Sequence, residues 1–534
     1  MIPRRTFLKG LTATGATVVL NPLNAIGSRS KNSFDYFGVH PFIENNPDAV
    51  FIMRTNVDVK TNAAAFKQAG FDFAKSVFVN IAAGAGAVPL SHKIVIKPNL
   101  TARGSWMTGY TVERSRSVVT DVYFVEGIIE SMKTLGLPAN QFYLREVNAP
   151  EDWEDGGYTA MAERTGAELR DMSKKVGRIS ENDLQWKDVP AGGWFVRIPY
   201  LWPINTADSW LLNVAKLKAH SMGITLCAKN LQGTIAHYYQ KHCEFFRVDM
   251  DMNPAHIQPQ AESEIERNYY RHVAEGIPRW DRPGPEGGIW QEIWATRCLD
   301  NNSVLKPGLN VVEGICGRDG NFIEGPGEDG FARDFMTNVI IFGKNSFYVD
   351  IIGKWLAGHE PGNFGMFHLA LERGFISSIN PGQIPLYEWN ADGTANLKPL
   401  SDFEQTPLKT KYLQRDYDGQ DEPKWHLVNE PFDYAPSTVN FTKARLPEAI
   451  VLHQNYPNPF NPHTAIQFSL PKNGYACLEI FNGQGRRVAV LADGYYSGGN
   501  HLVAWHTRNQ PSGTYLYRLH FEGFSQTRRM VLVK

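Results

Sequence analysis

Short apolar runs alternate with helical patterns through the middle of the chain, and this constrains the fold more than any other feature. Residues 93–97 form a strand-like run that ends at Pro98, and residues 120–135 repeat apolar side chains at three- and four-residue intervals. The pattern continues with strands expected at 142–147, 209–217, 309–314 and 339–342 and a helix at 158–164. Such alternation is typical of an α/β domain whose mainly parallel sheet is covered by helices on both faces. We predict this domain over residues 35–430.

Two polar, proline-containing stretches interrupt the alternation. Residues 240–295 predict an irregular insertion or lid within the α/β domain. Residues 431–450 predict a linker to a second domain over residues 451–534. A chain of 534 residues exceeds the size that one hydrophobic core serves, so more than one domain is expected.

The N-terminal segment has the pattern of an export signal. Residues 4–9 (Arg-Arg-Thr-Phe-Leu-Lys) precede an apolar run over 11–20, and small residues follow Pro22. Residues 1–30 resemble a twin-arginine signal peptide, which implies the twin-arginine translocase as a partner and transit through the periplasm. The apolar run is shorter than the roughly 20 residues of a transmembrane helix. We therefore expect no transmembrane segment in the mature chain.

The C-terminal residues 451–534 predict a small all-β domain. Prolines and asparagines dominate residues 454–462, and alternating strand-like runs follow with Asn-Gly, Ser-Gly-Gly and Pro-Ser-Gly between them. This spacing predicts an immunoglobulin-like sandwich. The segment resembles the C-terminal sorting domain of the type IX secretion system. The resemblance implies the type IX machinery as a partner and a final location at the cell surface or outside the cell.

Charge and cysteine content restrict the partners and cofactors. The formal net charge is −1 and the pI is near 7.0, so no general positive field attracts nucleic acid, and we expect none as a partner. The five cysteines form no C-x-x-C pair. An iron–sulfur cluster would therefore need cysteines from distant parts of the chain.

Residues 213–220 carry the clearest candidate site. In a strand with a period of two, Lys216, Lys218 and His220 lie on one face and apolar residues lie on the other. Two ammonium groups and an imidazole would then converge. The alternative is an exposed edge strand whose lysines prevent pairing with other chains.

The segments around this strand supply further polar groups. After a turn, residues 224–232 predict a helix that carries Lys229 and Asn230. Lys97 and Asn99 lie at the end of an earlier strand. Strand ends that meet helix N-termini in an α/β sheet favour anion binding. We therefore expect a site for a small carboxylate or phosphate.

Three carboxylates in later segments are candidate ligands of a divalent metal. Glu313 ends a strand-like run, Asp319 lies in a glycine-rich segment, and Asp350 follows the strand expected at 339–342. Hard cations take oxygen ligands of this kind. The alternative role of Asp350 is to cap a helix expected at 351–357.

These segments together resemble one known family. The matching motifs are Lys-Pro-Asn-Leu at 97–100, residues 213–220, Ala-Lys-Asn-Leu-Gln-Gly at 228–233, Glu-Gly at 313–314, Gly-Pro at 325–326 and Asp350. They are similar to the family catalogued as domain of unknown function 362, over roughly residues 91–374. Some relatives are described as iron–sulfur proteins because they carry an added ferredoxin segment. This chain lacks that cysteine run, which removes the main reason to expect an electron carrier.

We therefore predict an exported enzyme whose reaction class the sequence does not specify. Its lysines would hold a small anion, and His220 would transfer protons because the ordinary pKa of histidine lies near neutrality. The predicted roles are catalysis by His220 and Lys218, ligand binding by Lys97, Asn99, Lys216, Lys229 and Asn230, and metal binding by Glu313, Asp319 and Asp350. One alternative is a noncatalytic cell-surface protein that binds an anion or a glycan through the aromatic residues between Trp186 and Trp294. Another is an iron-containing redox protein.

Overall fold

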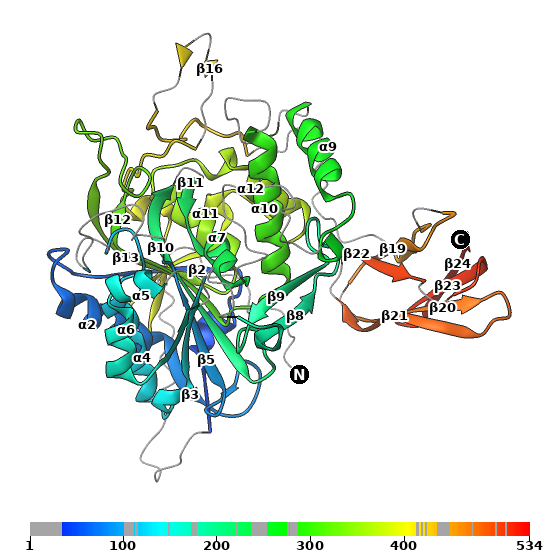
Figure 1. Ribbon diagram of the computed structural model, residues 1–534, viewed down its shortest axis with the longest axis horizontal. Coiled ribbons are helices and arrows are strands. Elements are labelled where there is room, and N and C mark those ends of the chain that lie inside the picture. Colours follow the sequence, from blue (N-terminus) through cyan, green and yellow to red (C-terminus); the bar gives the residue numbers. More distant parts are fainter. Residues whose placement is uncertain are drawn as a thin grey trace, which may run out of the picture.

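The computed structural model contains an α/β body and a separate all-β domain (Figure 1). It describes residues 35–100, 112, 116–147, 150–171, 179–220, 223–236, 254–274, 277, 287–412, 416–417, 420–421, 424–434, 449–455, 458–472, 474–496, 499–507 and 510–533. The predicted signal peptide, residues 1–30, lies outside them. Within the described residues, no helix combines the length and the apolar character that crossing a membrane requires.

A ten-stranded sheet forms the centre of the body, in the order β15-β14-β2-β13-β12-β10-β5-β6-β7, with β11 paired to β10. Its strands are β2 (Val50–Arg54), β5 (Lys93–Pro98), β6 (Phe142–Glu146), β7 (Glu168–Asp171), β10 (Ser209–His220), β11 (Gly223–Thr225), β12 (Leu309–Arg318), β13 (Asp334–Gly343), β14 (Leu386–Trp389) and β15 (Ala395–Leu397). Strands β7, β6, β5, β10 and β12 are parallel, and β13 is antiparallel to both of its neighbours, β12 and β2. The mainly parallel sheet predicted from the sequence is confirmed.

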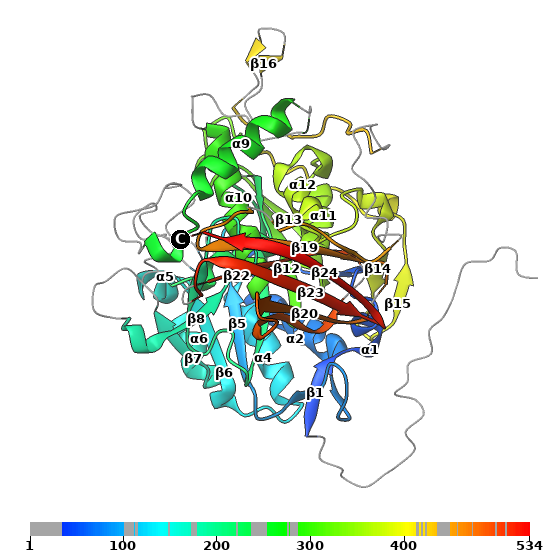
Figure 2. The same ribbon diagram turned by 90° about the vertical axis from the view of Figure 1, so that its right-hand side faces the viewer.

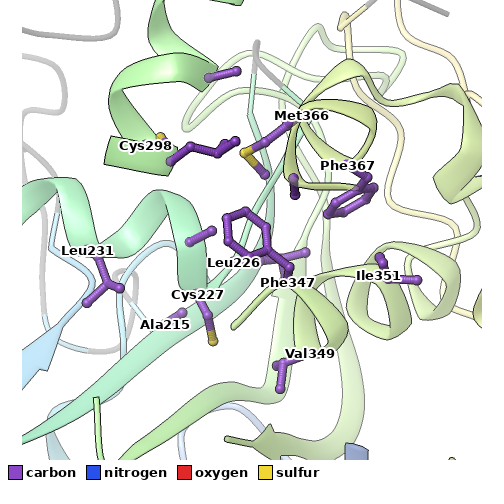
Figure 3. Packing of buried hydrophobic residues seen from close by; sticks show 14 of the residues in the cluster. Ala215, Leu226, Cys227, Leu231, Cys298, Phe347, Val349, Ile351, Met366 and Phe367 are labelled. Atoms are coloured by element: carbon purple, nitrogen blue, oxygen red, sulfur yellow. The ribbon is translucent and has the colours of Figure 1, made fainter. Parts of the chain in front are cut away.

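Helices cover both faces of the sheet, as Figures 1 and 2 show. Helices α2 (Ala63–Val77), α4 (Val122–Lys133), α5 (Pro150–Asp155) and α6 (Tyr158–Thr165) pack on one face, and α7 (Cys227–Asn230), α10 (Gly287–Val304), α11 (Ser346–Leu356) and α12 (Gly365–Glu372) pack on the other. We call the core beneath α2 and α4 the first core and the core beneath α10 and α11 the second core. Strand β10 contributes Leu212 and Val214 to the first core and Ala215, Leu217 and Ala219 to the second. Figure 3 shows Ala215 in the second core. The alternation predicted for residues 213–220 is therefore observed.

Two glycines let α2 and α4 approach each other closely. A Cβ atom on Gly70 would lie 2.0 Å from the carbonyl oxygen of Phe124, and one on Gly127 would lie 2.1 Å from that of Lys67. A larger residue at either position would push the helices apart in a closely packed layer. This contact fixes α4, whose N-cap Asp121 lies at the edge of the sheet.

The insertion predicted at 240–295 is only partly irregular. Helix α9 (Ala261–Ala274) lies within it, α10 begins within it and continues to Val304, and residues 240–253 and 278–286 are outside the described part of the chain. Helix α10 belongs to the second core rather than to a lid. Its buried side chains include Arg297, Asp300 and Asn301. Because polar groups are buried along with apolar ones, α10 shows no clear apolar stripe in the sequence.

Smaller elements complete the body. They are α1 (Pro41–Glu44), a sheet of β1 (Tyr36–Val39), β3 (Phe78–Ile81) and β4 (Val88–Pro89), and the pairs β8 (Leu184–Asp188) with β9 (Arg197–Leu201) and β16 (Asp416–Tyr417) with β17 (Gln420–Asp421). The body extends beyond the predicted boundary at residue 430, because the Tyr434 hydroxyl donates a hydrogen bond to Glu360. Residues 435–448 of the predicted linker lie outside the described residues.

The C-terminal domain consists of two antiparallel sheets around its own core. One sheet contains β18 (Val451–Leu452), β19 (His463–Leu470) and β22 (Gly499–His506), and the other contains β20 (Gly474–Asn482), β21 (Arg487–Tyr496), β23 (Gly513–Phe521) and β24 (Phe524–Leu532). Ile466 of the first sheet and Leu478 and Tyr517 of the second are fully buried in this core. The arrangement is consistent with the predicted β-sandwich.

Candidate functional site

Four neighbouring strands bring charged side chains to the carboxyl edge of the sheet. In the strand register, Lys97 of β5 lies opposite Asn213 of β10, and Lys216 of β10 lies opposite Glu313 of β12. Glu146 ends β6, the neighbour of β5. Strand β10 has a partner on each side, so the alternative of an exposed edge strand is wrong. We refer to Lys97–Glu146 and Lys216–Glu313 as the inner ion pairs.

The first inner ion pair is completely enclosed. Lys97 Nζ donates to the Glu146 carboxylate, to the Pro98 carbonyl oxygen at 2.7 Å and to Asn230 Oδ1 at 3.0 Å. Burial lowers the pKa of Lys97 and raises the pKa of Glu146, and their mutual attraction opposes both shifts. Gly233 leaves room for the pair, because a Cβ atom there would lie 2.0 Å from Glu146 Oε1. The charge of Lys97 is therefore neutralised within the protein.

Asn230 connects the short helix α7 to two strands. Its Oδ1 accepts a hydrogen bond from Asn99 Nδ2 at 3.1 Å, and its Nδ2 donates to Asn213 Oδ1 at 2.8 Å and to the Lys97 carbonyl oxygen at 3.2 Å. Asn99 Oδ1 is buried and accepts no hydrogen bond from any described residue. Asn230 is thus a positioning residue, whereas Asn99 keeps one acceptor available.

The second inner ion pair is equally buried. Lys216 Nζ lies 2.5 Å from Glu313 Oε2, and neither side chain is exposed. The Glu313 carboxylate also accepts hydrogen bonds from the backbone N–H groups of Asp121 at 3.2 Å and Ile315 at 3.0 Å. Burial, with the nearby negative charge of Glu313, raises the pKa of Asp121 to about 6. Lys216 and Glu313, predicted as a ligand-binding residue and a metal ligand, neutralise each other here.

Phe322 covers Lys218 and His220 at the end of β10. Its ring centroid lies 4.8 Å from Lys218 Nζ and 5.1 Å from the His220 ring, which meets it edge-on. The backbone φ of Phe322 is 59°, in the left-handed region that costs a bulky residue about 1–2 kcal/mol. Arg318 Nη1 holds this conformation by donating to the Phe322 carbonyl oxygen at 2.6 Å. Backbone strain of this kind concentrates at functional sites.

His220 is a neutral imidazole in this environment. Burial, followed by the positive charges of Lys229, Lys218 and Lys411, lowers its pKa well below the ordinary value. The expectation of a pKa near neutrality is therefore wrong, because both influences disfavour the imidazolium. Thr410 Oγ1 donates to the His220 carbonyl oxygen at 2.6 Å and anchors the end of β10. The predicted role of His220 in proton transfer remains a prediction.

Lys354 of α11 is a buried amine among aromatic rings. Its Nζ lies 3.7 Å from the ring centroid of Phe364 and 5.8 Å from that of Tyr412. Burial lowers the pKa of Lys354 to about 7, with Asp350 opposing the shift and Lys229 adding to it. No hydrogen bond or ion pair connects its Nζ to another residue of the described ranges. Lys354 was not predicted as a site residue.

Lys229 is half-buried and lies near Lys354. Its positive charge lowers the pKa of Lys97, His220 and Lys354, so it lies near all three. Like Lys354, it forms no hydrogen bond or ion pair with other described residues. We refer to Lys218, His220, Lys229 and Lys354 as the cationic group.

The three carboxylates predicted as metal ligands have separate partners. Glu313 is paired with Lys216, Asp319 Oδ1 accepts from the Arg333 N–H at 2.6 Å, and Asp350 accepts from the N–H groups of residues 227–228 at 2.7 and 2.9 Å. Across the described ranges, no three His, Cys, Asp or Glu side chains form a group that could hold a metal ion. The structure does not bring these three carboxylates together.

Asp350 caps a different helix from the one predicted. Helix α11 begins at Ser346 with Asn345 as its N-cap, so Asp350 lies inside it and its carboxylate binds the N-terminus of α7. Burial raises the pKa of Asp350 to about 7 against the effect of these hydrogen bonds. Helix α7 itself starts at Cys227, later than predicted, because residues 224–225 pair with β10.

Glu146 and Lys354 were not predicted from the sequence. They differ in whether a sequence pattern indicates them. Glu146 ends the strand expected at 142–147, just as Lys97 ends its own strand, so the same rule of polar strand ends identifies it. Lys354 lies one helical turn after Asp350, which is the spacing of side chains on one helix face. Its burial among aromatic rings has no signal in the sequence.

Two alternatives gain no support from the described part of the chain. Trp194 and Trp294 are buried in the second core, and Trp186 packs against His256 at 4.1 Å between ring centroids. These tryptophans do not form an exposed stacking surface for a glycan. The described cysteines form no disulfide with one another and no metal-binding group: Cys227, Cys298, Cys316 and Cys477.

Comparisons with known proteins identify both domains. Residues 94–354 match the family described as Domain of unknown function (DUF362), and residues 454–534 match the family described as Secretion system C-terminal sorting domain. None of the curated proteins compared with the chain matches it. The crystal structure of dimeric latent PorU from Porphyromonas gingivalis is similar at 21% identity over 16% of this chain and 9% of that one, with a TM-score of 0.14. That likeness is too limited to support a structural argument.

Both predicted family resemblances are therefore confirmed. The sorting domain indicates export to the cell surface or the extracellular space, with the type IX secretion machinery as a partner.

Proposed function

We propose that this chain, which carries a DUF362 domain and a type IX sorting domain, is an exported enzyme that binds a small organic carboxylate or phosphate next to the cationic group. One observation carries the proposal: positive charge at the sheet edge exceeds the negative charge available to it. The inner ion pairs neutralise Lys97 and Lys216. Lys229 and Lys354 have no carboxylate bound to them among the described residues. An anionic ligand would supply the missing charge.

The position of the site supports the same proposal. Ligands of open α/β sheets bind at the carboxyl ends of the strands, where helix N-termini also meet. The inner ion pairs are rigidly held there by strand register and by Asn230. A site built on such a frame binds without reorganising its walls, which favours affinity.

Asn99 adds a preference for ligands that carry a hydroxyl group. Its Oδ1 is buried and accepts no hydrogen bond within the described ranges, while its Nδ2 is held by Asn230. A buried acceptor left unpaired costs about 1–3 kcal/mol, so a ligand hydroxyl that donates to it would gain affinity. We therefore favour a hydroxycarboxylate or a sugar phosphate over a simple anion.

The roles within the cationic group follow from the charges. Lys229 and Lys218 hold the anion, and His220 forms a hydrogen bond to it as a neutral imidazole. Lys354 is the group able to exchange protons near pH 7, because burial lowers its pKa to about 7. A metal held by Glu313, Asp319 and Asp350 is not part of the proposal, since these carboxylates have separate partners.

The proposal is tested by calorimetric titration of the full chain with lactate, acetate and inorganic phosphate. We expect lactate to bind more tightly than acetate, and Lys229→Met to weaken binding of both by about tenfold or more. Lys472→Met, an exposed lysine of the sorting domain, is the matched control and leaves binding unchanged. Equal effects of the two variants, or no binding of any anion, contradict the proposal.

We also propose that residues 1–30 direct export by the twin-arginine route before the sorting domain acts. The paired arginines at positions 4 and 5 and the following apolar run support it. In a bacterium with both export systems, Arg4→Lys with Arg5→Lys should retain the protein in the cytoplasm, whereas deletion of residues 454–534 should stop it in the periplasm. Normal secretion of the double arginine variant would contradict this route.

A further inference from the structure

Four lysines of the described body are almost completely buried, and they are not alike: Lys97, Lys216, Lys218 and Lys354. Lys97 and Lys216 each contact a buried glutamate. Lys354 is also only 3% exposed, but within the described ranges its Nζ forms no hydrogen bond or ion pair. A purely structural buried lysine is normally paired, because an unpaired buried charge is strongly unfavourable. Burial and the charge of Lys229 favour the neutral amine, whereas the rings of Phe364 and Tyr412 favour the ammonium; burial is the largest of these influences.

The immediate neighbours of Lys354 leave its nitrogen without a carboxylate partner. The nearby carboxylate, Asp350, is occupied by the backbone N–H groups of residues 227–228. The ring of Phe364 covers one side of the amine. On another side the backbone of Gly223 passes so close that a Cβ atom there would lie 2.8 Å from Nζ. A lysine in an apolar pocket next to another cation is the arrangement that activates amine nucleophiles.

We propose that Lys354 is a nucleophile that forms an imine with a small aldehyde or ketone bearing a carboxylate or a phosphate. This inference rests on the proposed function and extends it, since Lys229 would hold the anionic group while Lys354 attacks the carbonyl carbon. The burial of Lys354, which lowers its pKa to about 7, supports the assignment because much of the amine is then neutral at physiological pH.

The chemistry balances without a cofactor. The lone pair of the neutral Lys354 amine forms a bond to the carbonyl carbon, and the carbonyl oxygen receives the proton lost by the nitrogen. The resulting carbinolamine loses water and leaves a C=N bond. Hydrolysis reverses both steps and releases the amine. A protonated imine withdraws electrons from the neighbouring carbon, which is the purpose of such covalent intermediates.

The test is reductive trapping on the full chain. The protein is incubated with pyruvate or dihydroxyacetone phosphate, borohydride is added to reduce any imine to a stable amine, and the adducts are located by peptide mass spectrometry. We expect one dominant adduct at Lys354 and none at Lys97 or Lys216. Acetone, which has a carbonyl but no anionic group, should give about tenfold less adduct at Lys354. Lys354→Arg keeps the positive charge and should abolish the adduct, with Lys472→Arg as the matched control.

The outcomes separate this inference from the proposed function. Binding of lactate without any adduct at Lys354 overturns the inference and leaves the anion site standing. An adduct at Lys354 that is equally strong with acetone, and unaffected by Lys229→Met, supports a reactive amine but overturns the anion site. Adducts spread evenly over surface lysines overturn the assignment of Lys354. If Lys354→Arg does not fold, the position of the adduct in the natural protein still decides the question.

Discussion

The inner ion pairs and the cationic group lie at the same edge of one sheet, yet they differ in whether their lysines have carboxylate partners. The inner ion pairs join side chains of adjacent strands. Strand register places Lys216 directly opposite Glu313, and Glu146 ends the strand next to that of Lys97. The cationic group takes its members from the end of β10 and from two helices, and Lys229 and Lys354 meet no carboxylate of the described residues. The comparison shows one region whose charges are paired within the protein and one in which the proposed anion would supply the partner.

The inner ion pairs and the cationic group also differ in how they contribute to stability. A buried ion pair contributes little net stability, because desolvation offsets the attraction, but loss of one partner leaves a buried charge uncompensated. Lys229 of the cationic group has no such ion pair within the described ranges. We therefore expect substitutions in the inner ion pairs to affect folding and substitutions in the cationic group to affect binding and titration.

Removal of one partner of an inner ion pair should have the largest effect. We expect Glu146→Gln to lower the free energy of unfolding by about 3–5 kcal/mol, because the charge of Lys97 is then buried without a counterion. Chemical denaturation of the body measures this change. The double variant Lys97→Met with Glu146→Leu is the control and should recover most of the loss. If the single variant is as stable as the natural protein, the pair does not have the role described.

The pH dependence of stability should separate Asp350 from the inner ion pairs. The pKa of Asp350 rises from 3.8 to about 7 on folding, so the folded state holds the proton more tightly. The resulting stabilisation is complete below about pH 4 and is lost as the pH rises through about 7. Relative to Asp350→Asn, the natural protein should lose up to about 1.4 kcal/mol per pH unit in this window. A flat difference between the natural protein and Asp350→Asn across this window contradicts the burial described.

Loss of the Lys229 charge should shift the pKa values of His220 and Lys354 but should hardly change the free energy of unfolding. Lys229 lowers the pKa of both His220 and Lys354. We expect Lys229→Met to raise the pKa of both groups, while the free energy of unfolding changes by less than about 0.5 kcal/mol. Nuclear magnetic resonance titration of the labelled side chains measures the shifts. Unchanged pKa values would mean that Lys229 is not close to them.

The smallest effect on stability is expected at Phe322. Phe322→Gly removes the backbone strain of about 1–2 kcal/mol but also removes the ring that covers Lys218 and His220, so the two changes should largely cancel. Because water then reaches the imidazole, the pKa of His220 should rise towards its ordinary value. Phe331, an exposed phenylalanine in the same segment, provides the control when changed to Gly. A His220 pKa that is equally unaffected in both variants would contradict a covering role.

The fold and the gathering of polar strand ends at one edge of the sheet could be predicted from the sequence, whereas the pairing of charges could not. Apolar alternation identified the strands, and polar residues at their ends identified Lys97, Lys216 and Lys218. The partners Glu146 and Glu313 lie 49 and 97 residues from their lysines, and only the strand order determines which strand ends become neighbours. The sequence also gave no measure of burial, which lowers the pKa of His220 and Lys354. The alternative of Asp350 as a helix cap named the wrong helix, because α11 begins five residues earlier with Asn345, an equally good N-cap.

The place of β2 in the sheet has a consequence for synthesis. The strand Val50–Arg54 is made early, but its two neighbours are β13, at 334–343, and β14, at 386–389. Such distant pairing is slow to form, and a chain interrupted before β14 would keep one edge of β2 open to aggregation. The sorting domain begins after these strands, at residue 454. A truncated chain with an incomplete sheet therefore also lacks the sorting domain, so translation order itself keeps unfinished molecules out of the type IX secretion step.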